Sequence, residues 1–99
     1  MKPAALMKLW GNTCAYCGVQ VWLRTPKFGK ALASADHYWP RCSGGLTSRH
    51  NMVLTCAQCN IAKSGRDPRD WLPEEIRERV ESKLSELKNN PYLEPMGEK

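Results

Sequence analysis

The sequence has 99 residues, a formal net charge of +5 and a hydrophobic fraction of 41%. A chain of this length forms one domain, and domains this small bury so little surface that a metal site or a disulfide often supports them. No stretch of about 18 apolar residues occurs, which excludes a membrane-spanning helix, and the N-terminus lacks the apolar core of a secretion signal. We therefore expect an intracellular, cytoplasmic protein. In that reducing compartment, paired cysteines are interpreted as metal ligands in preference to disulfides.

Charge is unevenly distributed along the chain. Residues 1–72 hold ten Lys or Arg against three Asp, a balance of +7, whereas residues 73–99 have a balance of −2. A basic surface of this kind attracts the phosphate backbone of nucleic acid without reading its sequence. We therefore expect DNA as a partner, bound by the first part of the chain.

The N-terminal segment contains two short predicted elements. Leu6, Leu9 and Trp10 recur at helical spacing, which predicts one or two helical turns within residues 1–10. Residues 19–24 are predicted to form the first strand. Residues 25–30 form a predicted turn with two lysines, for which a phosphate contact and a plain solvated loop are equally reasonable interpretations.

Four cysteines form two CxxC pairs, Cys14 with Cys17 and Cys56 with Cys59, separated by 38 residues. Two such pairs supply the four thiolates of a tetrahedral zinc site. The alternatives for the first pair are two buried thiols or a redox motif. A redox CxxC normally opens a helix after a strand in a βαβ unit, and no such pattern occurs here. The spacing therefore predicts a structural Zn²⁺.

The central stretch contains two predicted strands and a helix. Residues 31–39 form the first of these strands, ending at Pro40, and residues 52–55 form the second after a loop that bends at Gly44 and Gly45. A short helix then runs from Cys56 to about residue 65. On it, Asn60 and Lys63 share a face displaced by about 100° from that of the cysteines.

A C-terminal amphipathic helix is predicted from residue 73 to about residue 90. Ile76, Val80, Leu84 and Leu87 form one apolar stripe. We expect this helix to pack on its own domain in a monomer; a dimer or partner surface is the alternative. Residues 91–99 are expected to form a flexible tail.

Several motifs in order resemble the HNH endonuclease family. They are Asp36-His37, Pro40, Gly44-Gly45, Asn51, and the CxxCN sequence that ends at Asn60, followed by Lys63. The resemblance covers residues 10 to about 72 and includes the cysteines that many members use to bind zinc. It implies a small α+β domain of the zinc-stapled ββα-metal type, here with an added C-terminal helix. It also implies hydrolysis of nucleic acid with one divalent metal ion.

The resemblance gives four residues a role in catalysis. His37 is the expected general base, because a neutral imidazole can accept a proton from water near pH 7. Asp36 and Asn60 would bind the catalytic ion. Asn60 stands where many members have histidine, and two oxygen ligands favour Mg²⁺ or Mn²⁺ over softer ions. Asn51 would hold the loop and His37 in place through hydrogen bonds.

Other residues near these motifs have weaker assignments. Lys63, Arg41 and Arg49 are expected to contact the substrate backbone, although either arginine could simply be solvated. His50 is interpreted as a loop or capping histidine, with a substrate or metal contact as the alternative. Cys42 is interpreted as a small apolar side chain in the loop.

One geometric difficulty concerns Asp36 and His37. Neighbouring residues of a strand point to opposite faces, so the two can serve one centre only at a twisted or bulged strand end. We expect a DNA endonuclease that nicks or cuts both strands. A non-catalytic zinc module that binds nucleic acid is the alternative, and a purely structural zinc adaptor is a third interpretation.

Overall fold

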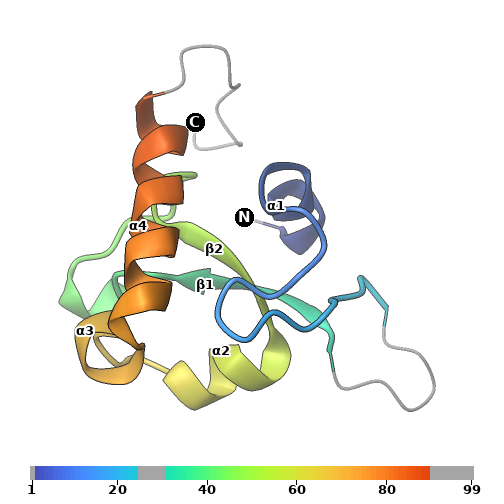
Figure 1. The fold of residues 1–99 in the computed structure, drawn as a ribbon, viewed down its shortest axis with the longest axis horizontal. Coiled ribbons are helices and arrows are strands. Elements are labelled where there is room, and N and C mark those ends of the chain that lie inside the picture. The colour runs from blue at the N-terminus through green and yellow to red at the C-terminus, as the bar shows by residue number, and fades with distance from the viewer. Residues whose placement is uncertain (1, 25–30, 90–99) are drawn as a thin grey trace.

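The computed structural model describes residues 2–24 and 31–89. In chain order these residues form α1 (Pro3–Trp10), β1 (Ala33–His37), the 3-10 helix η1 (Arg41–Ser43), β2 (Met52–Cys56), α2 (Ala57–Lys63), α3 (Pro68–Trp71) and α4 (Glu74–Asn89) (Figure 1). This mixed architecture confirms the predicted α+β class. The turn expected at residues 25–30 and the tail expected at residues 91–99 lie outside the described residues. Within the described part of the chain, no helix has the length and apolarity needed to cross a bilayer.

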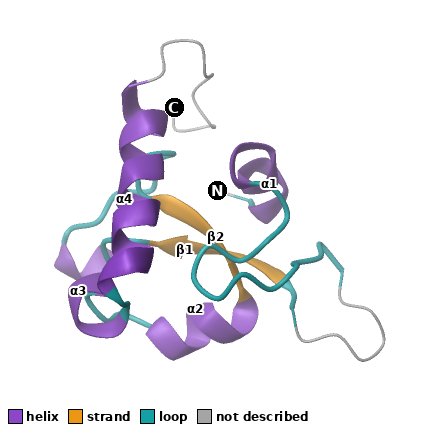
Figure 2. Ribbon diagram, viewed as in Figure 1, coloured by secondary structure: helices purple, strands orange, loops and turns teal. Residues whose placement is uncertain are grey.

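The two strands pair in antiparallel fashion, with a register that runs from Ala33 opposite Cys56 to His37 opposite Met52. All five residues of β2 are buried. Both α1 and α2 contact both strands, and Figure 2 shows one helix above the strands and the other below them. Because β2 is covered on both faces, its burial does not alternate as in a half-exposed strand, and its residues are apolar except for the buried Thr55.

The strand predicted at residues 19–24 does not form, so that prediction was wrong. Among residues 2–24 and 31–89, the segment's β-pairing consists of two isolated bridges, Thr13 with Gln20 and Trp22 with Leu32. Gly18 takes a φ of 81° as the chain turns, and the amide of Cys14 donates to the carbonyl of Val19. The segment therefore divides its pairing between two different partners, and neither pairing is long enough to make a ladder.

Helix α4 packs against the rest of the domain along its apolar stripe. Val80 and Leu84 belong to the same buried cluster as Leu6 and Val53, and Leu87 is also buried. Burying an aliphatic side chain of this size contributes about 1.5 to 3 kcal/mol.

Polar contacts fix the rotation of α4 about its axis. The hydroxyl of Tyr38 donates to Oε2 of Glu81 at 2.6 Å. The guanidinium of Arg79 donates to the carbonyl of Ala15 at 2.9 Å. The apolar stripe of α4 is therefore held toward the domain core.

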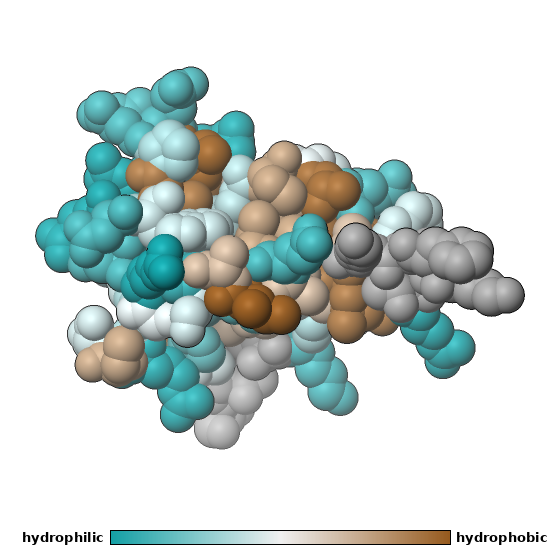
Figure 3. All heavy atoms as spheres, turned by 90° about the horizontal axis from the view of Figure 1, so that it is seen from below, coloured by the Kyte–Doolittle hydropathy of each residue, from teal (hydrophilic) through white to brown (hydrophobic). Residues whose placement is uncertain are grey.

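The surface mixes apolar and hydrophilic residues. A view from below shows brown apolar spheres among teal hydrophilic ones (Figure 3). The large hydrophobic side chains that remain exposed include Val19, Trp22, Leu23, Leu32, Trp39, Leu46 and Ile61. Scattered exposed apolar residues are normal on soluble domains and carry no functional assignment by themselves.

Candidate active site and metal centre

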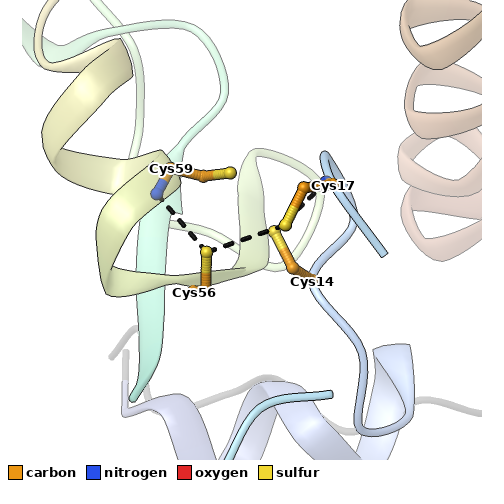
Figure 4. Close-up of side chains that lie close together, drawn as sticks. All are labelled: Cys14, Cys17, Cys56 and Cys59. Carbon is orange, nitrogen blue, oxygen red and sulfur yellow. Dashed lines mark hydrogen bonds between the residues drawn. The ribbon is translucent and has the colours of Figure 1, made fainter. Parts of the chain in front are cut away.

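The four predicted zinc ligands converge on one point between the loop that follows α1 and the start of α2 (Figure 4). Their sulfur atoms all lie within 4.8 Å of one another, and the sulfurs of Cys17 and Cys56 are 3.8 Å apart. A tetrahedral zinc ion with Zn–S bonds of about 2.3 Å separates its sulfurs by about 3.8 Å. The cluster therefore has the dimensions of a structural zinc site.

Local backbone geometry prepares the sulfurs to carry negative charge. The amides of Tyr16 and Cys17 donate to Sγ of Cys14 at 3.4 and 3.5 Å. Cys56 is the N-cap of α2, and its sulfur accepts from the amide of Cys59 at 3.4 Å. Hydrogen bonds to a thiolate favour the charged form.

The thiols influence one another. Burial acts to raise the pKa of Cys14, but hydrogen bonds from three backbone amides lower it overall. Burial, and then the negative charge of Cys14, raise the pKa of Cys59. The charge of one thiolate therefore disfavours ionisation of the neighbouring thiols. A bound divalent cation would allow all four to ionise together.

Asp36 and His37 line one cleft on the surface beside α2. The cleft residues are Ala35, Asp36, His37, Pro40, Arg41, Cys42, Asn60, Ser64 and Gly65. Strand β1 ends at His37, and the chain then turns through Pro40 into η1. Asp36 and His37 therefore both line the cleft, although neighbouring residues of a strand point to opposite faces, and His37 is the last residue of β1.

Asp36 is 4% exposed and is held by two partners. Its Oδ2 accepts a hydrogen bond from the hydroxyl of Tyr16 at 2.6 Å and lies 3.1 Å from Nζ of Lys63. Burial, and then the charge of Asp36, raise the pKa of Tyr16, so the phenol keeps its proton and remains a donor. Both partners bind the same oxygen of Asp36.

Lys63 occupies a different position from the one expected. Its side chain is fully buried, and its ammonium donates to the carbonyl of His37 at 3.0 Å in addition to pairing with Asp36. The position of Lys63 on the predicted helix had indicated that this ammonium would face a substrate. The structure instead places it under the cleft, because a buried carboxylate needs a nearby positive charge.

Asn60 uses its amide nitrogen within the fold. Nδ2 donates to Oγ of Ser34 at 2.6 Å, with the carbonyl of Ala35 a further acceptor at 3.5 Å. Since the nitrogen is fixed as the donor, the amide oxygen is the atom left to bind a cation. Asp36 and Asn60 thus offer oxygen atoms in one cleft, which fits the donor set of a hard divalent ion.

His37 is partly buried at the edge of the cleft. Its Nε2 lies 2.8 Å from Oγ1 of Thr47. Burial, and then the positive charge of Arg41, lower the pKa of His37 below its ordinary value of 6.5. The ring is therefore neutral near pH 7 and is held at one nitrogen by Thr47.

Asn51 is buried and connects the two ends of the loop between the strands. Its Oδ1 accepts from the amide of Trp39 at 2.9 Å, and its Nδ2 donates to the carbonyls of Trp39 at 3.1 Å and Leu46 at 2.7 Å. A side chain on Gly45 would collide with the carbonyl oxygen of Trp39, so only glycine allows this closure. Asn51 reaches His37 indirectly, through the loop that carries Thr47.

The two arginines assigned to substrate lie in different surroundings. Arg41 is exposed and lines the cleft. Arg49 is partly buried and donates from Nε to the carbonyl of Leu87 at 3.1 Å, which ties the loop to the last turns of α4. Only Arg41 of this pair is placed beside Asp36 and His37.

His50 and Cys42 lie on different sides of the loop. His50 contacts Oγ of Ser48 at 3.2 Å and lines a second cavity between the loop and α4, together with Trp39 and Arg69. Cys42 lines the cleft, and its thiol donates to the carbonyl of Gly65 at 3.7 Å.

Two residues at the site were missed by sequence reasoning, Tyr16 and Thr47. Tyr16 lies between the cysteines of the first pair, and this position was a usable signal because zinc binding fixes the segment in space. Thr47 carried no comparable signal. Its contact with His37 depends on how the loop closes.

Comparison with protein families gives one match. Residues 14–66, just over half of the chain, match the family described as HNH endonuclease. No curated protein and no solved structure matches the chain. The matched range contains both cysteine pairs and every cleft residue named above.

Proposed function

Because the chain belongs to the HNH endonuclease family, we propose that it is a metal-dependent endonuclease that hydrolyses phosphodiester bonds in DNA. The observation that carries this proposal is the single cleft that holds Asp36, His37 and Asn60, with Arg41 at its edge. A carboxylate, an imidazole and an amide oxygen in one cleft are the groups that metal-assisted hydrolysis requires.

Asp36 and Asn60 would hold the catalytic ion. The donor set supports Mg²⁺ or Mn²⁺, since one oxygen of Asp36 is anchored by Tyr16 and Lys63 and the nitrogen of Asn60 is anchored by Ser34. When bound, the ion would offset negative charge on the phosphate and on the leaving 3′ oxygen. The same fold would be stabilised by Zn²⁺ at the cysteine cluster.

His37 would act as the general base. Nε2 of His37 lies 2.8 Å from Oγ1 of Thr47. In the tautomer that carries its proton on Nε2, this nitrogen would donate to Thr47 and Nδ1 would be the ring atom that accepts a proton from water. The water oxygen would then form a bond to phosphorus while the bond from phosphorus to the 3′ oxygen breaks, and the leaving oxygen takes a proton from solvent.

Arg41 would contact a phosphate of the substrate. Its side chain is exposed beside the cleft, and arginine binds phosphate oxygens through a planar set of donors. Lys63 would act beneath the surface, as the counter-charge of Asp36.

A second candidate function is that of a non-catalytic zinc module that binds nucleic acid. The observation that favours it is the buried ion pair of Asp36 with Lys63, because a carboxylate with such a partner can serve the fold alone. In that case the cysteine cluster and the basic surface would be the functional features.

Plasmid cleavage by the zinc-loaded protein separates the two functions. We expect conversion of supercoiled to nicked or linear DNA with Mg²⁺ or Mn²⁺, and a loss of about 100-fold or more in His37→Ala. His50→Ala is the matched control, since His50 is the other of the two histidines in the chain, and it should cleave normally.

The opposite result would show no cleavage with any metal, while the protein and His37→Ala shift DNA equally in a gel. That outcome would favour the binding module. A parallel assay with single-stranded RNA would show whether the substrate is restricted to DNA.

A further inference from the structure

We propose that Tyr16 is a positioning residue that couples the cysteine cluster to the cleft, by holding the Asp36 carboxylate in the orientation that binds the divalent ion. This inference rests on the function proposed above. It concerns a side chain that is not among the residues that line the cleft.

The contact between Tyr16 and Asp36 is short and buried. Both residues are 4% exposed, and the hydroxyl donates to Oδ2 at 2.6 Å. With Oδ2 taken by Tyr16 and Lys63, the carboxylate cannot rotate without losing two strong hydrogen bonds. Asp36 also lines the cleft, and we infer that its other oxygen, Oδ1, is the atom that would bind the ion there.

The cysteine cluster fixes the position of Tyr16. Tyr16 lies between Cys14 and Cys17, and its own amide donates to Sγ of Cys14. Its ring packs edge-on against Trp71 at 5.6 Å, and the neighbouring amide of Ala15 donates to the carbonyl of Leu54 on β2 at 2.9 Å. Backbone, ring and hydroxyl of Tyr16 are each held by a different part of the domain.

The second partner of Asp36 also comes from an element of the cysteine cluster. Lys63 is the last residue of α2, which carries Cys59 and begins directly after Cys56. Metal binding by the cysteines therefore orders both groups that hold Oδ2. Coupling of this kind is reciprocal, so occupation of each metal site raises the affinity of the other.

The competing interpretation is that Tyr16 is a core tyrosine whose hydroxyl merely needs an acceptor. The chain contains a matched case, because Tyr38 donates to Oε2 of Glu81 at the same distance of 2.6 Å and Glu81 lies on α4. Replacing either tyrosine by phenylalanine removes one hydroxyl and one hydrogen bond to a carboxylate. Only the Tyr16 replacement removes a bond to a proposed metal ligand.

The experiment measures Mn²⁺ binding by the EPR signal of free Mn²⁺, with zinc-loaded wild type, Tyr16→Phe, Tyr38→Phe and Asp36→Asn. Native mass spectrometry gives the zinc content of each protein. Loss of a group that supports a metal ligand typically weakens binding about 10- to 100-fold. We expect a shift of that size in Tyr16→Phe, a shift under about twofold in Tyr38→Phe, and one bound zinc in both. Asp36→Asn gives the limit for a lost carboxylate.

Several results would overturn the inference. Equal Mn²⁺ affinity in Tyr16→Phe and Tyr38→Phe would show that the hydroxyl does not position Asp36, and normal cleavage by wild type would leave the proposed function intact. Loss of zinc from Tyr16→Phe would show that the Tyr16 hydroxyl supports zinc binding by the cysteines and not the position of Asp36. Absence of both Mn²⁺ binding and cleavage in wild type would remove the proposed function and this inference together.

Discussion

The cysteine cluster and the cleft differ in what holds their polar groups in place. Around the cluster, sulfurs face one another within 4.8 Å, and the nearest donors are backbone amides. Around the cleft, Asp36 has Tyr16 and Lys63, and Asn60 has Ser34. The cluster therefore needs a cation to hold it together, whereas the cleft is built by protein contacts.

The two proposed metals would therefore have different relations to folding. A site whose ligands must lose their protons to bind metal, and which folding alone brings together, contributes its binding energy to folding. A site whose ligands are already paired keeps its shape when the ion leaves. Zinc is expected to determine stability, and Mg²⁺ or Mn²⁺ to determine activity.

Removal of zinc should have the largest effect. Structural zinc sites contribute about 10 to 16 kcal/mol of apparent binding free energy at neutral pH, which is comparable to the entire stability of a small domain. We expect Cys56→Ser to be largely unfolded, as measured by circular dichroism. Cys42→Ser, the fifth cysteine, is the control and should fold. A folded, zinc-free Cys56→Ser protein would contradict the comparison.

Loss of the counter-charge beneath the cleft should have the next largest effect. Lys63→Met leaves the buried Asp36 carboxylate without its cation, which typically costs about 3 to 5 kcal/mol. Urea unfolding of the zinc-loaded protein measures the difference. Arg69→Met is the control, because it breaks the exposed pair with Asp67 and should change stability much less. Equal losses of unfolding free energy in the two variants would show that burial does not increase the contribution of the Asp36–Lys63 pair to stability.

Loss of the contact between Thr47 and His37 should affect activity more than folding. Thr47→Val removes the hydroxyl that lies 2.8 Å from Nε2 and leaves the imidazole free to turn. Misplacement of a catalytic group by about 1 Å can cost up to about 100-fold in rate. Plasmid cleavage rates measure this loss, and Thr47→Ser should restore most of the activity. Cleavage at the normal rate by Thr47→Val would show that Thr47 does not position His37.

Addition of the catalytic ion should have the smallest effect on stability. At ten times its dissociation constant, Mn²⁺ would stabilise the zinc-loaded protein by about 1.4 kcal/mol. Thermal unfolding with and without Mn²⁺ tests this value, with Asp36→Asn as a variant that should not respond. If the zinc-loaded protein needed Mn²⁺ in order to fold, the cleft would not be preformed. The distinction between the two centres would then fail.

The sequence by itself determined the features that depend on local spacing. Two CxxC pairs predict a common metal because each pair closes a short loop, and the four sulfurs do converge. The stripe of Ile76, Val80, Leu84 and Leu87 predicts a helix with one buried face. In α4 the last three are buried, and Ile76 is partly buried against the same core. The family motifs also depend on spacing alone, and the match over residues 14–66 confirms the resemblance.

Only the tertiary structure decided which distant groups meet. Tyr16 and Asp36 are 20 residues apart in sequence, and Lys63 was expected at the surface until its pairing with Asp36 placed it under the cleft. Residues 19–24 had the composition of a strand, yet within the described part of the chain they pair through isolated bridges. Periodicity records which side of an element is apolar, whereas hydrogen bonds and ion pairs between elements depend on how those elements pack. That is why the cysteine cluster could be predicted from the chain and the support of Asp36 could not.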